Sequence, residues 1–122
     1  MTKEQYSNNR RYDLEERTTK FGKLVIGLCK QLPINAINMK LITQVVGSAG
    51  SIGANYREAN DALGKKDFAL RVRIARKETK ETIHWLDLLK ESNPVVKEKV
   101  DEIISEAIEL RNILSAIIKK VN

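Results

Sequence analysis

The chain contains little of what builds disulfide frameworks or β-sheets. Its 122 residues include one cysteine, two prolines, six glycines and 5% aromatic residues. The single Cys29 cannot form an internal disulfide, and its place in an apolar helical pattern predicts a buried structural thiol. Runs that alternate apolar and polar residues are absent, which argues against half-buried strands. The composition therefore favours an all-α chain.

Long apolar runs are also missing. No segment approaches the roughly 20 apolar residues that a membrane-spanning helix needs, and residues 1–20 are too polar for a secretory signal. Hydrophobic residues make up 42% of the chain and charged residues 31%, which is typical of a globular domain. We therefore expect one cytoplasmic domain that does not enter a membrane.

Basic residues outnumber acidic ones, 22 to 16, which gives a formal net charge of +6. The excess is uneven. Residues 1–33 and residues 65–91 each carry a net charge of +3, whereas the remaining segments are neutral. A basic face on the first and third of these segments could hold phosphates electrostatically. A solvated helix face with no ligand is the alternative.

Apolar residues recur at helical spacing in four segments that are joined by short connections. Pro33 ends the first segment, because proline disfavours the helical conformation of the residue before it. Four helices with short connections are typical of an up-down-up-down bundle. The sequence therefore predicts a single-domain, all-α, antiparallel four-helix bundle. Its predicted parts are a flexible N-terminal arm at 1–12 and a bundle at 13–122, with helices at about 13–32, 38–63, 67–91 and 94–121.

Polar residues at the segment ends predict where the helices begin and end. Asp13 and Glu16 have the spacing of a capping box, which places the start of the first helix at Asp13. Gly64 is predicted to close the second helix, and Asp67 to cap the third. Asn93, which precedes a proline, is predicted to cap the fourth.

Three glycines fall within the second segment, between Gly47 and Gly53. Each weakens a helix by roughly 1 kcal/mol relative to alanine, so we expect them to permit a tight crossing with another helix. The alternative is a phosphate-binding glycine loop. That interpretation fails, because no strand precedes the glycines and no Gly-Lys-Ser/Thr sequence follows them.

Polar side chains also occur where the second and third helices are expected to face each other. Buried polar groups need partners, so we predict a polar network that sets the register of these two helices. A ligand or nucleic-acid contact at the same residues is the alternative. The predicted members of this structural polar network are Ser48, Ser51, Asn55, Glu58, Lys77, Glu78 and Glu81.

No catalytic constellation is evident in the sequence. Glu81 and His84 match the Glu-x-x-His pattern of di-iron bundles, but that chemistry needs two such motifs and the chain has one histidine. Cys29 and His84 have no evident orienting partner for nucleophilic catalysis. We therefore expect no enzyme activity, no catalytic residue, no metal and no cofactor.

A set of residues from the first to the third segment resembles a known family. The matching residues are Tyr12-Asp13-Leu14-Glu15-Glu16-Arg17-Thr18, Phe21, Leu32-Pro33, Gln44, Ser48, Ser51-Ile52-Gly53-Ala54-Asn55, Arg57-Glu58-Ala59, Asp67-Phe68, Arg76-Lys77-Glu78, Glu81-Thr82 and Trp85-Leu86. In these residues the chain resembles the four-helix-bundle proteins first noticed as reading frames in intervening sequences of bacterial 23S rRNA genes. That family also includes the accessory variability determinant proteins of diversity-generating retroelements.

The resemblance implies a protomer that assembles into a cyclic homopentamer. In the retroelement branch it implies a basic barrel that binds RNA and a reverse transcriptase. Gly47 and Gly50 depart from the bulkier or basic residues expected at their positions, which predicts weaker nucleic-acid contact there.

We expect a non-enzymatic, basic, oligomeric bundle that binds nucleic acid, with structured RNA favoured, through phosphate contacts. The rival hypothesis is a protein-interaction scaffold, such as an accessory subunit of a reverse transcriptase, that does not bind nucleic acid directly. Under that hypothesis the basic residues only keep the protein in solution. The predicted phosphate contacts are Arg10, Arg11, Arg17, Lys20, Lys23, Lys65, Lys66, Arg71, Arg73 and Arg76.

Overall fold

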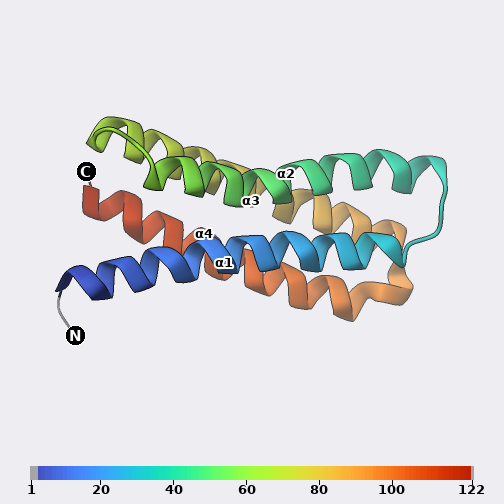
Figure 1. Cartoon of the computed structure of the whole chain (residues 1–122). Helices are drawn as coiled ribbons and strands as arrows, with labels where there is room; N and C mark the ends of the chain where they lie inside the picture. The colour runs from blue at the N-terminus through green and yellow to red at the C-terminus, as the bar shows by residue number, and fades with distance from the viewer. Residues whose placement is uncertain (1–2, 122) are drawn as a thin grey trace.

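A computed structural model describes the backbone of residues 3–121 and the side chains of residues 13–121. Four long helices run antiparallel to one another along the chain, and no strand occurs within residues 3–121 (Figure 1). The start of the first helix and the end of the fourth lie at the same end of the bundle. The predicted all-α, up-down four-helix bundle is confirmed. The helices are α1 (Lys3–Lys30), α2 (Ala36–Asn60), α3 (Lys65–Ser92) and α4 (Lys97–Val121), with a short 3-10 turn η1 (Pro94–Val96) before α4.

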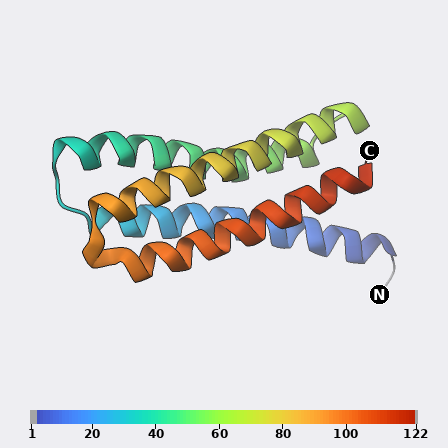
Figure 2. The same ribbon diagram turned by 180° about the vertical axis from the view of Figure 1, so that it is seen from behind.

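Each helix contacts its neighbours in the chain, and α4 also packs against α1 to close the bundle. Seen from the other side, α3 and α4 run side by side in front of α1 and α2 (Figure 2). The buried apolar side chains recur every three or four residues, so each helix turns one stripe inward. The largest fully buried apolar side chains are Phe21, Val25, Leu28, Val45, Ile52, Val72, Leu86, Leu89, Val100, Leu110 and Leu114.

The first helix is longer than the sequence predicts. It begins at Lys3, so the predicted arm at 1–12 and the predicted start at Asp13 are wrong for residues 3–12, while residues 1 and 2 lie outside the described residues. Residues 3–12 contain no glycine or proline and include Lys, Glu, Gln and Arg, which are good helix formers. Asp13 therefore lies inside a continuous helix and does not cap one.

The turn between α2 and α3 also differs from the prediction. α2 ends at Asn60 with Asp61 as its C-cap, so Gly64 does not close it. Gly64 is instead the N-cap of α3, with φ −166° and ψ 173°, an extended conformation that any residue adopts. Asp67 lies in the first turn of α3 and does not cap it. Its negative charge there interacts favourably with the positive end of the helix dipole.

Of the three glycines in α2, only Gly53 lies at a tight helix crossing as predicted. A Cβ atom added at Gly53 would lie 3.0 Å from Thr18 Oγ1, whereas nothing lies within 4 Å of one added at Gly47 or Gly50. Gly53 therefore lets α2 approach α1 closely. The prediction is wrong for Gly47 and Gly50 within the protomer, because both face outward and are exposed.

Two buried asparagines join the start of α2 to the end of α3. Asn38 Nδ2 donates to Asn93 Oδ1 at 2.9 Å, and Asn93 Nδ2 donates back to Asn38 Oδ1 at 3.0 Å. The same Nδ2 atoms also donate to the backbone oxygens of Pro33 and Leu89, each at 2.9 Å. Ser92 Oγ donates to Asn38 Oδ1 at 2.9 Å. Asn93 is therefore a buried partner of Asn38, and the predicted capping role of its side chain is wrong.

We expect Asn38→Ala and Asn93→Ala each to lower the free energy of unfolding by about 1–3 kcal/mol, because each leaves buried amide groups of its partner unsatisfied. The double variant should lose less than the sum of the two, since the partners share one interaction. Urea denaturation measures all three. Asn112→Ala, at an exposed position of α4, is the control and should change stability by less than about 0.5 kcal/mol. Additive losses would contradict the pairing.

Gly53→Ala and Gly27→Ala should change stability in opposite directions. Gly27 is exposed, and no atom lies within 4 Å of a Cβ added there, so alanine should stabilise α1 by about 0.5–1 kcal/mol through helix propensity. Gly53→Ala forces a methyl group against the buried Thr18 and should destabilise the protein through overpacking. Thermal unfolding checks both, and equal gains at the two positions would show that the α1–α2 crossing is loose.

Candidate nucleic-acid interface

The outward side of the first half of α3 carries a row of basic side chains. Lys66, Arg73, Lys77 and Lys80 follow one another at intervals of 7, 4 and 3 residues and are all exposed. These intervals keep the four side chains on one side of an α-helix. At 1.5 Å per residue the row is about 21 Å long. We call these four residues the basic stripe.

Sequence reasoning found only half of the basic stripe. Lys66 and Arg73 were predicted as phosphate contacts, whereas Lys77 was placed in the buried polar network and Lys80 was missed. The helical spacing of Lys77 and Lys80 from Arg73 was the signal that could have placed them together. Across residues 65–80, seven basic residues stand against two acidic ones.

Two further predicted residues flank the basic stripe. Arg71 lies toward α2, where its Nη1 atom donates to Asn55 Oδ1 at 3.5 Å. Arg76 lies toward α4, where its Nη1 atom donates to Ser115 Oγ at 3.4 Å. A guanidinium carries five N–H donors, so one such bond orients each side chain and leaves other donors for a ligand. Basic side chains are therefore most closely spaced around the middle of the basic stripe.

The ten predicted phosphate contacts do not form one surface. α1 packs against α2 and α4, and within residues 3–121 it does not contact α3. The exposed Lys20 and Lys23 of α1 therefore lie across the bundle from the basic stripe. Lys65 is exposed beside Lys66 at the start of α3. The side chains of two more predicted contacts, Arg10 and Arg11, lie outside the described residues.

Arg17 is the centre of an ion pair between α1 and α4. Its Nε and Nη2 atoms donate to the two carboxylate oxygens of Glu106, each at 2.8 Å, and Nη2 also lies 3.0 Å from Glu109 Oε2. Hydrogen bonds from Arg17 lower the pKa of Glu106, and the bond to Glu106 raises the pKa of Arg17. Arg17 therefore has an internal partner, and the phosphate contact predicted for it stays a prediction.

The predicted polar network between α2 and α3 is only partly present. Ser48 is buried and accepts a hydrogen bond of 2.8 Å from Thr82 Oγ1. The prediction that Glu58, Lys77 and Glu81 are buried is wrong, because all three are exposed. Two short side chains, Ser48 and Thr82, meet in the seam between α2 and α3. The long charged side chains therefore lie outside the seam.

The other predicted members of this network sit at the edge of the seam. Ser51 is half-buried, and its backbone oxygen accepts a bond of 2.9 Å from Asn55 Nδ2. Glu78 is also half-buried. Burial raises its pKa, and the nearby carboxylate of Glu81 adds to the shift, while Lys77 opposes it.

The outward side of α4 has the opposite charge. Glu98, Glu102 and Glu109 follow one another at intervals of 4 and 7 residues and are exposed, so they lie on one side of the helix. Lys119 and Lys120 lie in the last turn of that helix, which ends beside the start of α3. Positive and negative charge are therefore separated between two neighbouring helices, with the bundle end near the chain termini more basic on both.

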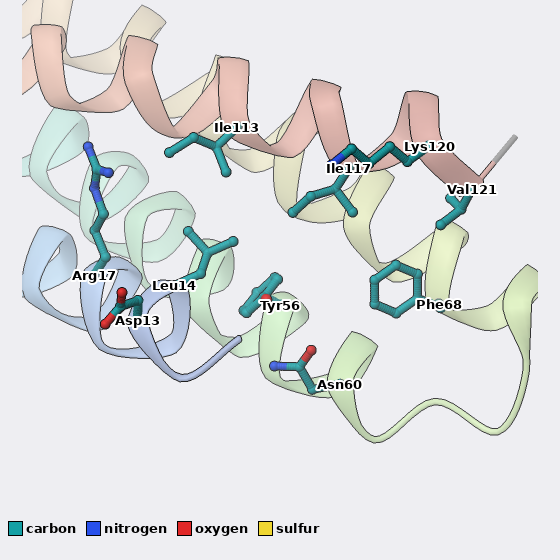
Figure 3. Close-up of a pocket in the computed structure, with 10 residues that line it drawn as sticks. All are labelled: Asp13, Leu14, Arg17, Tyr56, Asn60, Phe68, Ile113, Ile117, Lys120 and Val121. Carbon is teal, nitrogen blue, oxygen red and sulfur yellow. The ribbon is translucent and has the colours of Figure 1, made fainter. Parts of the chain in front are cut away.

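A cavity of about 410 Å³ lies at the same end of the bundle, between the four helices (Figure 3). Its polar groups are largely engaged, because Arg17 is paired with Glu106 and Asn60 Nδ2 donates to Glu15 Oε2 at 2.8 Å. The cavity thus offers mainly apolar surface and is not part of the charged site. Its lining residues are Asp13, Leu14, Arg17, Tyr56, Asn60, Phe68, Ile113, Ile117, Lys120 and Val121.

The remaining candidate groups are Cys29 and the exposed His84. Cys29 is half-buried against the core, slightly more open than predicted, and burial raises its pKa to about 11. No group of three or more potential metal ligands occurs among the described residues. None of the helices in the described part of the chain is long and apolar enough to span a bilayer.

The fold and this surface define a class of protein, an antiparallel four-helix bundle with a cationic row on one helix. A family model described as 23S rRNA-intervening sequence protein matches residues 10–116, and the chain belongs to that family. Among curated proteins no similar chain matches.

A solved structure is also similar to the chain. It is the crystal structure of a protein with unknown function from the S23 ribosomal protein family of Bacteroides thetaiotaomicron. The two proteins are 31% identical with a TM-score of 0.78, and the similarity covers 89% of this chain and 97% of that one.

Two glutamates should give opposite pH effects. The pKa of Glu106 is lowered in the folded state, so its stabilising contribution is present at neutral pH and is lost as the pH falls through that pKa. Glu106→Gln should lower stability at pH 7 by roughly 0.5–1.5 kcal/mol and flatten the acid limb of the stability curve. The pKa of Glu78 is raised above 4.5, so Glu78→Gln should stabilise the protein at pH 7. Denaturation from pH 3 to pH 7 tests both, and the same sign for the two variants would contradict the assignment.

Proposed function

We propose that this chain is a non-enzymatic, self-associating helical bundle that binds nucleic acid, structured RNA foremost, through phosphate contacts. The observation that carries the proposal is the basic stripe, four exposed cations along about 21 Å of one helix side. Cations that neutralise phosphates release counterions, so binding of this kind weakens as salt rises.

The surface favours contact with the backbone over reading of bases. No phenylalanine, tyrosine or tryptophan is exposed among the side chains of residues 13–121, so the stripe has no platform on which unpaired bases could stack. Lys and Arg contacts to phosphates fix position but carry no sequence information. We therefore propose binding that tolerates many sequences and favours structured over single-stranded RNA.

The family description refers to intervening sequences of 23S rRNA and names no ligand, so we favour RNA because the retroelement branch of the resemblance implies RNA binding. The resemblance noted above further suggests a cyclic pentamer, and for its retroelement branch a reverse transcriptase as partner. These form the rest of the proposal, together with a cytoplasmic location. The second candidate, a protein-interaction scaffold, is favoured by the acidic side of α4, which a basic protein partner would fit.

The test compares two triple variants that remove the same charge from opposite sides of the bundle. Lys66→Gln/Lys77→Gln/Lys80→Gln removes three cations of the basic stripe, and Lys20→Gln/Lys23→Gln/Lys30→Gln removes three exposed cations of α1. Fluorescence anisotropy with a labelled RNA hairpin, over a KCl series from about 50 to about 300 mM, should show at least roughly tenfold weaker binding for the stripe variant and a salt slope smaller by about 2–3.

The α1 variant should lose only a few-fold in affinity. Equal losses of affinity in the two variants would show that the overall net charge attracts the RNA and that the basic stripe is not a specific binding site. Absence of hairpin binding at every salt concentration would overturn the proposal of nucleic-acid binding. The protein-interaction scaffold would then remain as the candidate function, and capture of a reverse transcriptase would test it.

A further inference from the structure

The outward side of α2 differs from the rest of the surface because it carries no charge over most of its length. No residue from Leu41 to Tyr56 is charged, although 31% of the chain is. Thr43, Gly47, Gly50 and Ala54 are exposed there. A helix that lacks charge on every side is typical of one that is covered on every side. Within the described chain, this side of α2 is open to solvent.

Two glycines on this side have no use within the protomer. Gly47 and Gly50 weaken α2, yet no atom lies within 4 Å of a Cβ added at either one. Gly53, by contrast, makes room for Thr18. A side of α2 without Cβ atoms allows another backbone to approach closely, and that approach must come from outside the protomer.

The charges at the two ends of this side of α2 indicate that the approaching partner is a second copy of α2. Lys40 and Glu58 are both exposed and are separated by 18 residues, which is five whole turns of an α-helix and about 27 Å. They therefore lie on the same side of α2, one at each end, with opposite signs. A second α2 laid antiparallel on the first would bring each Lys40 to a Glu58 of the other copy. The surface is complementary to itself.

We propose that two copies of this chain associate through α2, in an antiparallel pair related by a two-fold axis at the level of Ala49. Such a contact is isologous, so every pairing occurs twice. Gly47 and Gly50 lie on either side of the axis and set the close approach. Lys40 and Glu58 of the two copies form ion pairs at both ends of the contact and fix its direction.

This contact concerns assembly and holds whether or not the protein binds RNA. Combined with the ring of five suggested by the resemblance, the contact predicts two rings and ten copies, and without the ring it predicts two copies. The assembled particle therefore contains an even number of chains. α3 and α1 flank α2 on opposite sides, and a two-fold axis perpendicular to the paired helices keeps the two α3 helices on one side. Both basic stripes then face the same way.

Charge exchange tests the pair without RNA present. Light scattering and sedimentation should give an even number of chains for the native protein. Lys40→Glu and Glu58→Lys should each weaken this association at least roughly tenfold, because like charges then meet at both ends. An equimolar mixture of the two variants should recover the association. In a mixed pair the introduced glutamate meets the introduced lysine at one end of the contact, and the native ion pair is kept at the other. Lys30→Glu, at an exposed position of α1, is the matched control and should change nothing.

The glycines give a second and independent measurement. Gly47→Ala/Gly50→Ala should raise the Tm at protein concentrations too low for association, because alanine strengthens the helix, yet shift association to roughly tenfold higher concentration or more. A loss of association with a lower Tm would be simple misfolding, and would overturn the role of the glycines.

Four other outcomes would overturn the proposal. They are an odd number of chains, a monomer at all concentrations, charge variants that associate like the native protein, and a mixture that fails to recover. Loss of hairpin binding in Lys40→Glu at unchanged mass would assign this side of α2 to nucleic acid. The protein can fail to bind RNA and still show the predicted even number of chains, so failure of the RNA proposal and failure of the α2 contact are distinguishable.

Discussion

The reciprocal hydrogen bonds between Asn38 and Asn93 fix how far α2 and α3 can slide along each other. Both side chains are buried, and a shift of one helix by even one turn would leave their amide groups without partners in a region that water does not reach. Apolar stripes alone tolerate such shifts, because leucines and valines pack in several registers. The position of each α3 residue relative to α2, including the basic residues on its outward side, depends on this pair.

Much of the fold follows from the sequence because helical periodicity is a local property. The stripes through Phe21, Val45, Val72 and Leu110 are visible as regular spacing, and short connections leave few arrangements for four helices. The helix ends were harder to predict. Asp13 and Gly64 match capping patterns, but those patterns also occur inside helices and loops, and a favourable run at residues 3–12 continued α1 past the predicted start.

The candidate site was less predictable because it depends on which helices are neighbours and on which way each side chain turns. Arg17 is one more basic residue in the sequence, and only packing of α1 against α4 gives it Glu106 as a partner. Lys77 has the spacing of a polar seam residue, but the seam is filled by Ser48 and Thr82. The two paired asparagines lie 55 positions apart in the chain, a distance at which no local pattern connects them.

The charge separation between α3 and α4 gives the protomer a dipole moment across the bundle. The positive row lies on one helix and Glu98, Glu102 and Glu109 on the next, so this dipole has a component perpendicular to the four helices. A polyanion that drifts toward the protein would exert a torque on it and rotate the α3 side forward before any contact forms. Under the proposed function, the glutamates of α4 would then help to orient the protein before contact, as the side that is turned away.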